Sequence, residues 1–212
     1  MYLASTVLAR AVLIWQHLAM HDPHEVTVTR QQTAREEIDL AIHLLMTDGS
    51  LICANLLAWA AVDMMKGVAA REGKTMMADW MADRIIPDRK KEWFGLLKEH
   101  YNFAKHADRD PDKTVNLGPS IVEWVIFEGV ADYGELYRMS TFPMFLHKVY
   151  MFARNPIMVN EMGQDNLRYA RALFGDSPEL KDVKRFYRTY LSDKKAIRQS
   201  IPAGAADWLQ WD

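Results

Sequence analysis

Cysteine is almost absent from this sequence, since Cys53 is the single one among 212 residues. A lone cysteine excludes an intrachain disulfide and a thiol cluster that could hold zinc or an iron–sulfur group. The chain therefore suits a reducing compartment, and we expect a cytoplasmic location. No cationic residue lies beside Cys53 in the sequence to activate its thiol. We expect this side chain to be buried and inert.

An excess of charge of one sign is also lacking. The 26 Lys and Arg residues nearly balance the 28 Asp and Glu residues, which leaves a formal net charge of -2. This balance excludes attraction of the whole molecule to nucleic acid or to an acidic membrane, so such a partner would have to meet a local patch. The sequence contains no Gly-rich phosphate loop, no Gly-x-Ser-x-Gly elbow and no dinucleotide fingerprint. Nucleotide-dependent enzymes and serine hydrolases are thereby excluded, and we expect no cofactor.

Strand signals are nearly absent, because no segment sustains an alternation of apolar and polar residues. The hydrophobic share of 50% and the charged share of 25% are those of an ordinary globular protein. Residues 50–71 and 120–139 are heavily apolar, which places both segments at the centre of a helical bundle. We predict an all-α fold, a single bundle of about seven to nine helices joined by short connections.

Helix boundaries recur along the chain. Thr29 and Thr33 each begin a possible capping box, Ser50 caps a new helix after Asp48-Gly49, and Gly73 ends that helix. Further boundaries are expected at Thr141 with Pro143, at Asn155-Pro156, at Ser177-Pro178 as cap and first helical residue, and at Ser192.

The first residues are apolar enough to suggest a signal peptide or a membrane anchor. Leu3 to Met20 is short for a membrane span, no basic region precedes it, and polar residues interrupt it at Arg10, Gln16 and His17. We expect residues 1–25 to form an amphipathic helix and a linker, residues 26–212 to form the bundle, and no membrane contact. Met20 is an alternative start of the protein.

His17 and His21 have the i, i+4 spacing that can ligate a metal from one helix face. Asp22-Pro23 is expected to end that helix, and no carboxylate–x–x–His pair occurs elsewhere to complete a di-iron bundle. We therefore predict no metal site.

The segment from Asp88 to Ala107 carries the densest local chemistry. At about 100° per residue, one side of this predicted helix is mainly apolar and the other is polar. His100 lies on the apolar side, where we expect a buried imidazole with a hydrogen-bond partner. The opposite side is either a solvated face or the lining of a cleft or dimer seam, and it holds Lys98, Asn102, Lys105, His106 and Arg109.

The run Tyr101-Asn102-Phe103-Ala104-Lys105-His106 resembles the motif of the HEPN superfamily of helical RNases. There an Arg, usually followed by a polar residue such as Asn, precedes a His near the end of a helix. The resemblance covers roughly residues 30–140 and implies an all-α homodimer that contacts RNA. It implies that Asn102 and His106 are the catalytic positions, with Lys98, Tyr101, Lys105 and Arg109 as binding residues.

Tyr101 stands where the family has its Arg. A metal-independent ribonuclease needs a base near neutral pH and a cation to offset the charge of the phosphorane. Lys105 or Arg109 would have to supply that cation. We therefore expect a member that contacts RNA or a nucleotide-bearing partner without strong catalysis, and we leave enzymatic activity undecided.

Three carboxylates line one stripe of the apolar segment 120–139, at Glu128, Asp132 and Glu135. Such a stripe either serves acid–base chemistry or pairs with cations of neighbouring helices, and we favour pairing, since buried charge is costly alone. The available cations are Lys98, Lys105 and Arg138, which could bring the carboxylates beside His106.

Residues 181–198 hold seven Lys and Arg against two Asp. We expect the outer face of an ordinary helix with its aromatics turned inward, at Phe186, Tyr187 and Tyr190. The alternative is a stripe that follows a nucleic-acid backbone. A different class of function is also open: a non-catalytic scaffold that assembles through the terminal helices and the tail Trp208-Leu-Gln-Trp211.

Overall fold

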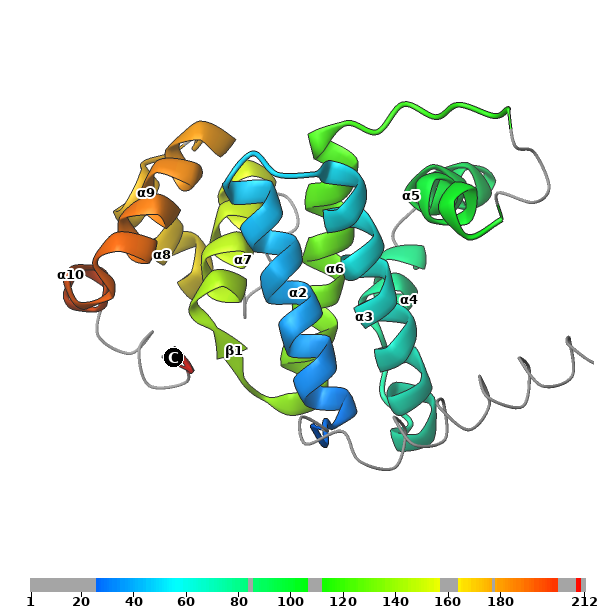
Figure 1. Ribbon diagram of the computed structural model, residues 1–212, viewed down its shortest axis with the longest axis horizontal. Coiled ribbons are helices and arrows are strands. Elements are labelled where there is room, and N and C mark those ends of the chain that lie inside the picture. The colour runs from blue at the N-terminus through cyan, green and yellow to red at the C-terminus, as the bar shows by residue number, and fades with distance from the viewer. Residues whose placement is uncertain are drawn as a thin grey trace, which may run out of the picture.

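The computed structural model describes residues 26–83, 86–106, 112–156, 164–176, 178–201 and 209–210. Within these ranges the fold is all-α, with nine α-helices, as the sequence predicts (Figure 1). The helices are α2 (Arg30–Met46), α3 (Leu51–Glu72), α4 (Met77–Ala82), α5 (Lys90–Lys105), α6 (Pro119–Tyr137), α7 (Phe142–Arg154), α8 (Gln164–Phe174), α9 (Leu180–Ser192) and α10 (Lys194–Ser200). A short 3-10 turn, η1 (Pro87–Arg89), precedes α5.

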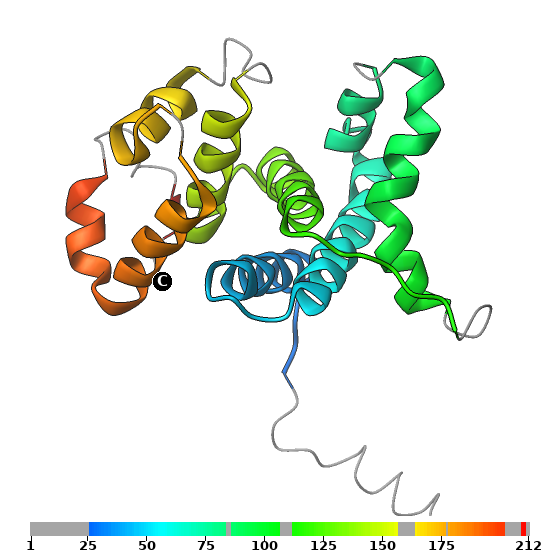
Figure 2. The same ribbon diagram turned by 90° about the horizontal axis from the view of Figure 1, so that it is seen from above.

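Helices α2, α3 and α6 pack on one another and form the centre of the bundle (Figure 2). The two segments predicted to lie at the centre, residues 50–71 and 120–139, correspond to α3 and α6 and do lie there. The helices are close at Gly129 of α6, where a Cβ would be in van der Waals contact, 3.4 Å from Cγ1 of Ile38 and 3.6 Å from Cγ2 of Val62. A larger side chain would push α6 away from α2 and α3.

Local capping chemistry accounts for most helix boundaries. The hydroxyl of Thr29 accepts a hydrogen bond from the Gln32 amide while the Gln32 side chain accepts one from the Thr29 amide, so the expected capping box forms. Ser50 caps α3, and Gly73 ends it in the left-handed conformation with φ of 64°. Thr141 caps α7 through the Met144 amide.

The start of α9 differs from the sequence prediction. The helix begins at Leu180, and its N-cap is Glu179, rather than Ser177 with Pro178 as first helical residue. The Glu179 amide donates to the Asp182 carboxylate at 3.2 Å, and this bond from three residues into the helix favours the later start. Similarly, the next helix, α10, is capped by Asp193 and not by Ser192.

Helices α7 to α10 form a second group on one side of the centre (Figure 2). As expected, the aromatic side chains of α9 face inward, with Tyr187 and Tyr190 buried and Phe186 half-buried. On its outer face Lys184 and Arg188 form ion pairs with Asp48 at the α2–α3 turn. Part of the basic charge of residues 181–198 is therefore neutralised within the protein.

A two-residue parallel pairing was not anticipated from the sequence. Strand β1 (Ser140–Thr141) pairs with β2 (Leu209–Gln210), which brings residues 209–210 against the α6–α7 junction. Two residues are too few to show the period-two alternation by which strands are recognised.

The prediction of a buried Cys53 is wrong, since its side chain is exposed. Its neighbour Ile52 is 61% exposed, whereas Ala54 and Asn55 in the same turn of α3 are buried. The helix therefore turns Cys53 outward at its first turn. Several predicted features lie outside the described residues: the helix at 1–25, the His17–His24 cluster, Arg109, and the tryptophans at 208 and 211.

Helix α3 alone, among the described helices, is long and apolar enough to cross a membrane by length and composition. Its packing between α2, α6 and α5 gives that apolar character a structural reason, because Trp59, Val62 and Met65 fill the centre of the bundle.

Candidate functional site

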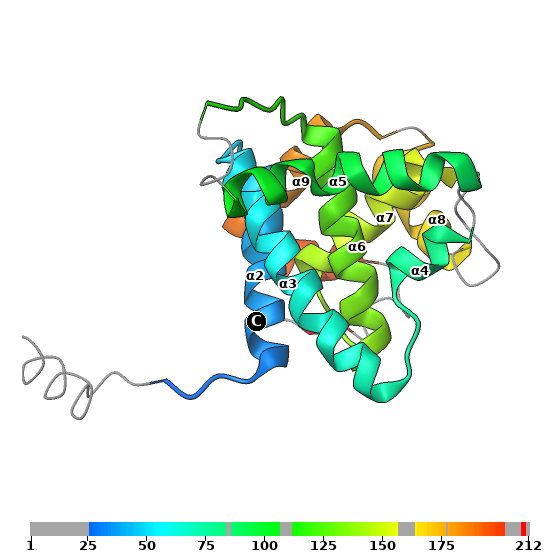
Figure 3. The same ribbon diagram turned by 90° about the vertical axis from the view of Figure 1, so that its right-hand side faces the viewer.

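Helix α5 crosses the outer side of α3 and α6 (Figure 3). Leu97 and His100 are its only buried side chains, and the indole N–H of Trp59 on α3 donates to the Leu97 carbonyl at 3.1 Å. His100 has the predicted partner, because its Nε2 lies 2.8 Å from the Asn116 carbonyl oxygen. These contacts hold the inner side of the helix, and its remaining side chains are half-buried or exposed.

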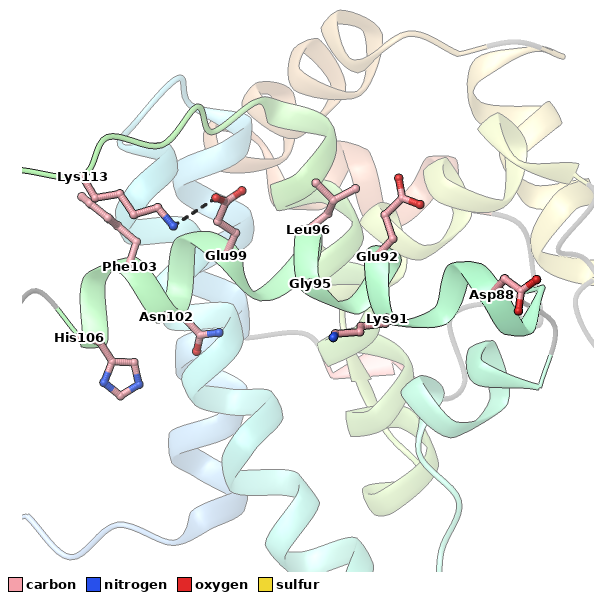
Figure 4. A pocket seen from close by; sticks show the side chains of 10 residues that line it. All are labelled: Asp88, Lys91, Glu92, Gly95, Leu96, Glu99, Asn102, Phe103, His106 and Lys113. Carbon is pink, nitrogen blue, oxygen red and sulfur yellow. Dashed lines mark ion pairs between the residues drawn. The ribbon is translucent and has the colours of Figure 1, made fainter. Parts of the chain in front are cut away.

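Asn102 and His106, the two positions that carry the HEPN resemblance, line one open pocket of about 850 Å³ (Figure 4). His106 lies just beyond the last turn of α5, and its backbone N–H donates to the Asn102 carbonyl at 2.9 Å. In Figure 4 both side chains point to the same side of the helix. Phe103 completes this end of the pocket.

The charge of the pocket is mixed. Among the described residues, its cations are Lys91 and Lys113, and its carboxylates are Asp88, Glu92 and Glu99. Lys113 forms an ion pair with Glu99 at 3.4 Å, as Figure 4 shows. Lys91 has no ion pair within the described part of the chain and remains available to an anion. The pocket thus attracts phosphate weakly at most.

The other predicted contact residues turn toward α3. Tyr101 stacks on Trp59 with ring centroids 5.8 Å apart, and its hydroxyl donates to Asp63 at 2.9 Å. The Lys98 ammonium lies 5.5 Å from the Trp59 ring centroid, and that of Lys105 lies 5.1 Å from the Tyr101 ring centroid. The polar face of α5 is therefore divided in two: Asn102 and His106 line the pocket, whereas Lys98 and Lys105 lie over an aromatic platform formed by Trp59 and Tyr101.

Within the acidic stripe of α6, only Glu128 approaches the Trp59 ring, and it does so through Lys66. Lys66 of α3 lies 3.6 Å from Glu128 and 5.3 Å from the Trp59 ring centroid. Glu135 forms the predicted ion pair with Arg138 at 2.9 Å. Lys105, the other predicted cation, forms no ion pair with the carboxylates of this stripe among the described residues. Asp132 accepts a hydrogen bond from the Met77 amide at 2.6 Å. None of the three carboxylates lines the pocket that contains His106.

Burial is the main cause of the pKa shifts of Glu128 and Asp132, the two buried carboxyl groups of this stripe. Desolvation raises the pKa of Glu128, against the opposing charges of Lys66 and Lys98. Desolvation also raises the pKa of Asp132 to about 7, although its hydrogen bond from Met77 acts in the opposite direction. At neutral pH the stripe therefore holds a proton in part of the molecules.

A partly buried cluster between α6 and α7, with Arg154 at its exposed edge, was not predicted from the sequence. Glu123 is 3% exposed, accepts from Arg154 at 2.5 Å, and accepts from the Tyr150 hydroxyl at 3.2 Å. Only the spacing of Tyr150 and Arg154 by one helical turn signals it in the sequence. The cluster lines no described pocket, so its contribution is to hold α7 against α6.

The described residues contain no group of three or more His, Cys, Asp or Glu that could hold a metal ion. Comparison with known proteins adds no further constraint, because the chain matches no protein-family model, no curated protein and no solved structure.

Proposed function

We propose that the protein contacts RNA, or another nucleotide-bearing partner, through the α5 pocket and does so without strong catalysis. The observation that carries the proposal is the position of Asn102 and His106 on one pocket at the end of α5. An amide and an imidazole can both hydrogen-bond base edges, and the exposed Lys91 can meet a phosphate. Phe103 offers an aromatic surface for a base. A cytoplasmic homodimer remains part of this proposal.

The same geometry argues for binding over cleavage. A histidine alone can move a proton, but cleavage also needs a cation close to the phosphorane. Tyr101 is held on Asp63, and the ammonium groups of Lys98 and Lys105 lie over aromatic rings. No arginine lines the pocket among the residues that the structure describes. Any RNA hydrolysis should therefore be weak.

Fluorescence anisotropy with a labelled ten-nucleotide single-stranded RNA tests the proposal. We expect His106→Ala to weaken binding about tenfold and Lys91→Gln about fivefold, as loss of one polar or charged contact implies. Arg71→Gln removes an exposed charge in the last turn of α3, outside both the pocket and the basic stripe at 181–198, and serves as the control, for which we expect no change. Because one or two phosphates are contacted, the slope of log K against log salt should be about -1.

A denaturing gel of the same samples measures cleavage. Intact RNA with wild-type protein agrees with a binding protein. Loss of RNA that His106→Ala prevents would instead identify a nuclease. Wild-type binding that neither α5 variant changes would remove this pocket from consideration.

A second candidate is the assembly module. It is favoured by partly exposed apolar side chains on α8 and α9. Phe174 and Phe186 are half-buried, their ring centroids lie 5.5 Å apart, and both line a pocket of about 340 Å³. Leu191 is 45% exposed. Light scattering after gel filtration tests it. A wild-type dimer that Leu191→Glu converts to a monomer would support assembly here, and a wild-type monomer at high concentration would contradict it.

A further inference from the structure

A smaller pocket lies between the start of α3, the end of α5 and the loop at 113–117. Its volume is about 270 Å³, and its walls are largely apolar. The apolar residues that line it are Ile52, Leu56, Phe103, Ala104, Val115 and Leu117. Phe103 and Lys113 also line the larger pocket, so the two pockets are neighbours.

Two buried hydrogen-bonding atoms lie at this smaller pocket without a partner. Asn55 and His100 both line it, are 1% and 7% exposed, and leave Asn55 Oδ1 and His100 Nδ1 unpaired among the described residues. A buried polar atom without a partner destabilises the fold, so such atoms are uncommon and usually have a function or a bound partner. This polar pair sets the pocket apart from an ordinary packing defect.

The tautomer of His100 follows from its other nitrogen. Nε2 faces the carbonyl oxygen of Asn116 at 2.8 Å, and a carbonyl only accepts, so Nε2 carries the hydrogen. In a neutral ring with the hydrogen on Nε2, Nδ1 has a lone pair and can accept. Asn55 Oδ1 is also an acceptor. Two residues of the apolar wall therefore carry a buried acceptor without a partner, which favours a ligand that donates.

We propose that this pocket binds a neutral molecule of one or two aromatic rings that carries an N–H or O–H donor. Apolar walls beside Phe103 suit a flat ring, and the volume admits a small bicyclic compound. A charged ligand would lose its hydration without a counter-ion, since Lys113 already pairs with Glu99. Each unpaired atom exposes less than 1 Å², so neighbouring groups must shift to let the donor reach it. This binding activity goes beyond the proposed RNA contact.

Indole and 1-methylindole form a matched pair of probes, because they share the ring and differ in the N–H donor. Titration of the full chain with each probe, followed by proton–carbon NMR of the Ile52, Leu56 and Val115 methyl groups, gives both affinities. We expect both to shift these methyl signals, and indole to bind about tenfold more tightly, as one hydrogen bond to a buried acceptor implies. Equal affinities, or no shift up to the solubility of indole, would overturn the proposal.

Two variants locate the interaction. Asn55→Leu removes one acceptor and keeps a similar side-chain volume. It should lower the ratio of the indole affinity to the 1-methylindole affinity severalfold. Unchanged methyl signals from α6 would show that the variant is folded. Ala104 is exposed at the rim, so Ala104→Trp should block the pocket and abolish binding of both probes without disturbing the core. Unchanged indole binding by Ala104→Trp would show that the probe binds elsewhere and would overturn the assignment.

Discussion

His147 lies fully buried in α7, and neither of its ring nitrogens has a hydrogen-bond partner among the described residues. Burial lowers the pKa of this imidazole to about 3. In the unfolded chain it returns to an ordinary value near 6.5. Between these values the unfolded state binds more protons than the folded state, so the free energy of unfolding falls as the pH falls below 6.5.

We therefore predict that His147→Leu reduces the loss of stability between pH 7 and pH 5. The difference in the free energy of unfolding between these pH values should shrink by about 2 kcal/mol relative to wild type, because about 1.4 kcal/mol corresponds to one pH unit. Urea unfolding at several pH values measures it. Parallel pH profiles of variant and wild type would contradict a neutral buried imidazole.

Asp132 changes the pH dependence of the free energy of unfolding in the direction opposite to that of His147. Burial raises its pKa from 3.8 to about 7, so between these values the folded state binds more protons than the unfolded state. The free energy of unfolding should fall as the pH rises through this range, and the contribution should level off above it. Asp132→Asn keeps an acceptor for the Met77 amide and removes the buried charge.

Asp132→Asn is expected to raise the free energy of unfolding at pH 8 by up to about 4 kcal/mol and to change it little at pH 4. Glu135→Gln on the same helix is the control, because its side chain is 44% exposed and its pair with Arg138 should be worth less than about 1 kcal/mol. An Asp132→Asn variant that is equally destabilised at both pH values would show that the carboxyl is ionised and well paired.

At the scale of the element, α5 is the most loosely attached helix near the proposed site. Its buried side chains are Leu97 and His100, and it is also held by the Trp59 indole, which donates to the Leu97 carbonyl, and by Tyr101, which stacks on Trp59 and donates to Asp63. Such limited burial predicts local opening of α5 at lower free energy than unfolding of α2, α3 and α6.

Trp59→Phe should therefore loosen α5 more than the rest of the bundle. We expect hydrogen exchange of the amides at 97–105 to become about ten times faster, as loss of one buried hydrogen bond of about 1.4 kcal/mol implies, while exchange in α6 changes less. Trp93→Phe is the matched control, since the Trp93 indole nitrogen has no partner among the described residues. Equal acceleration in both variants would indicate lost packing instead of the lost hydrogen bond.

Element boundaries show what could be predicted from sequence. Thr29, Ser50 and Gly73 were predictable because capping depends on side chains within a few positions of the helix end. The exposure of Cys53 was not, because a helix that is apolar almost all round does not reveal which residues of its first turn face solvent. The start of α9 depended on the less common cap Glu179, so Ser177 was the misleading choice.

The candidate site was predictable only in part, because several of its contacts join residues that are distant in the sequence. The shared side of Asn102 and His106 follows from their spacing by one helical turn. The turn of Lys98 and Tyr101 toward α3 depends on Trp59 and Asp63, which are distant in sequence and signal no contact by pattern. The unpaired acceptors of Asn55 and His100 likewise arise only when α3 and α5 meet.

At the scale of the whole molecule, the arrangement combines a closely packed centre with an open outer helix. Helices α2, α3 and α6 bury most of the large apolar side chains, while α5 exposes its pocket on their outer side (Figure 3). Substitutions in the pocket should therefore change binding with little effect on global stability. The basic face of α9 is the competing RNA surface, although Asp48 neutralises part of it.

Ultraviolet cross-linking of a single-stranded RNA that contains 4-thiouridine, followed by mass spectrometry of the digested protein, separates these surfaces most directly. We predict cross-links to residues 90–113, around Phe103 and His106, that His106→Ala reduces about tenfold at limiting RNA. Cross-links confined to residues 181–198, or none at all, would contradict the assignment of RNA contact to the α5 pocket.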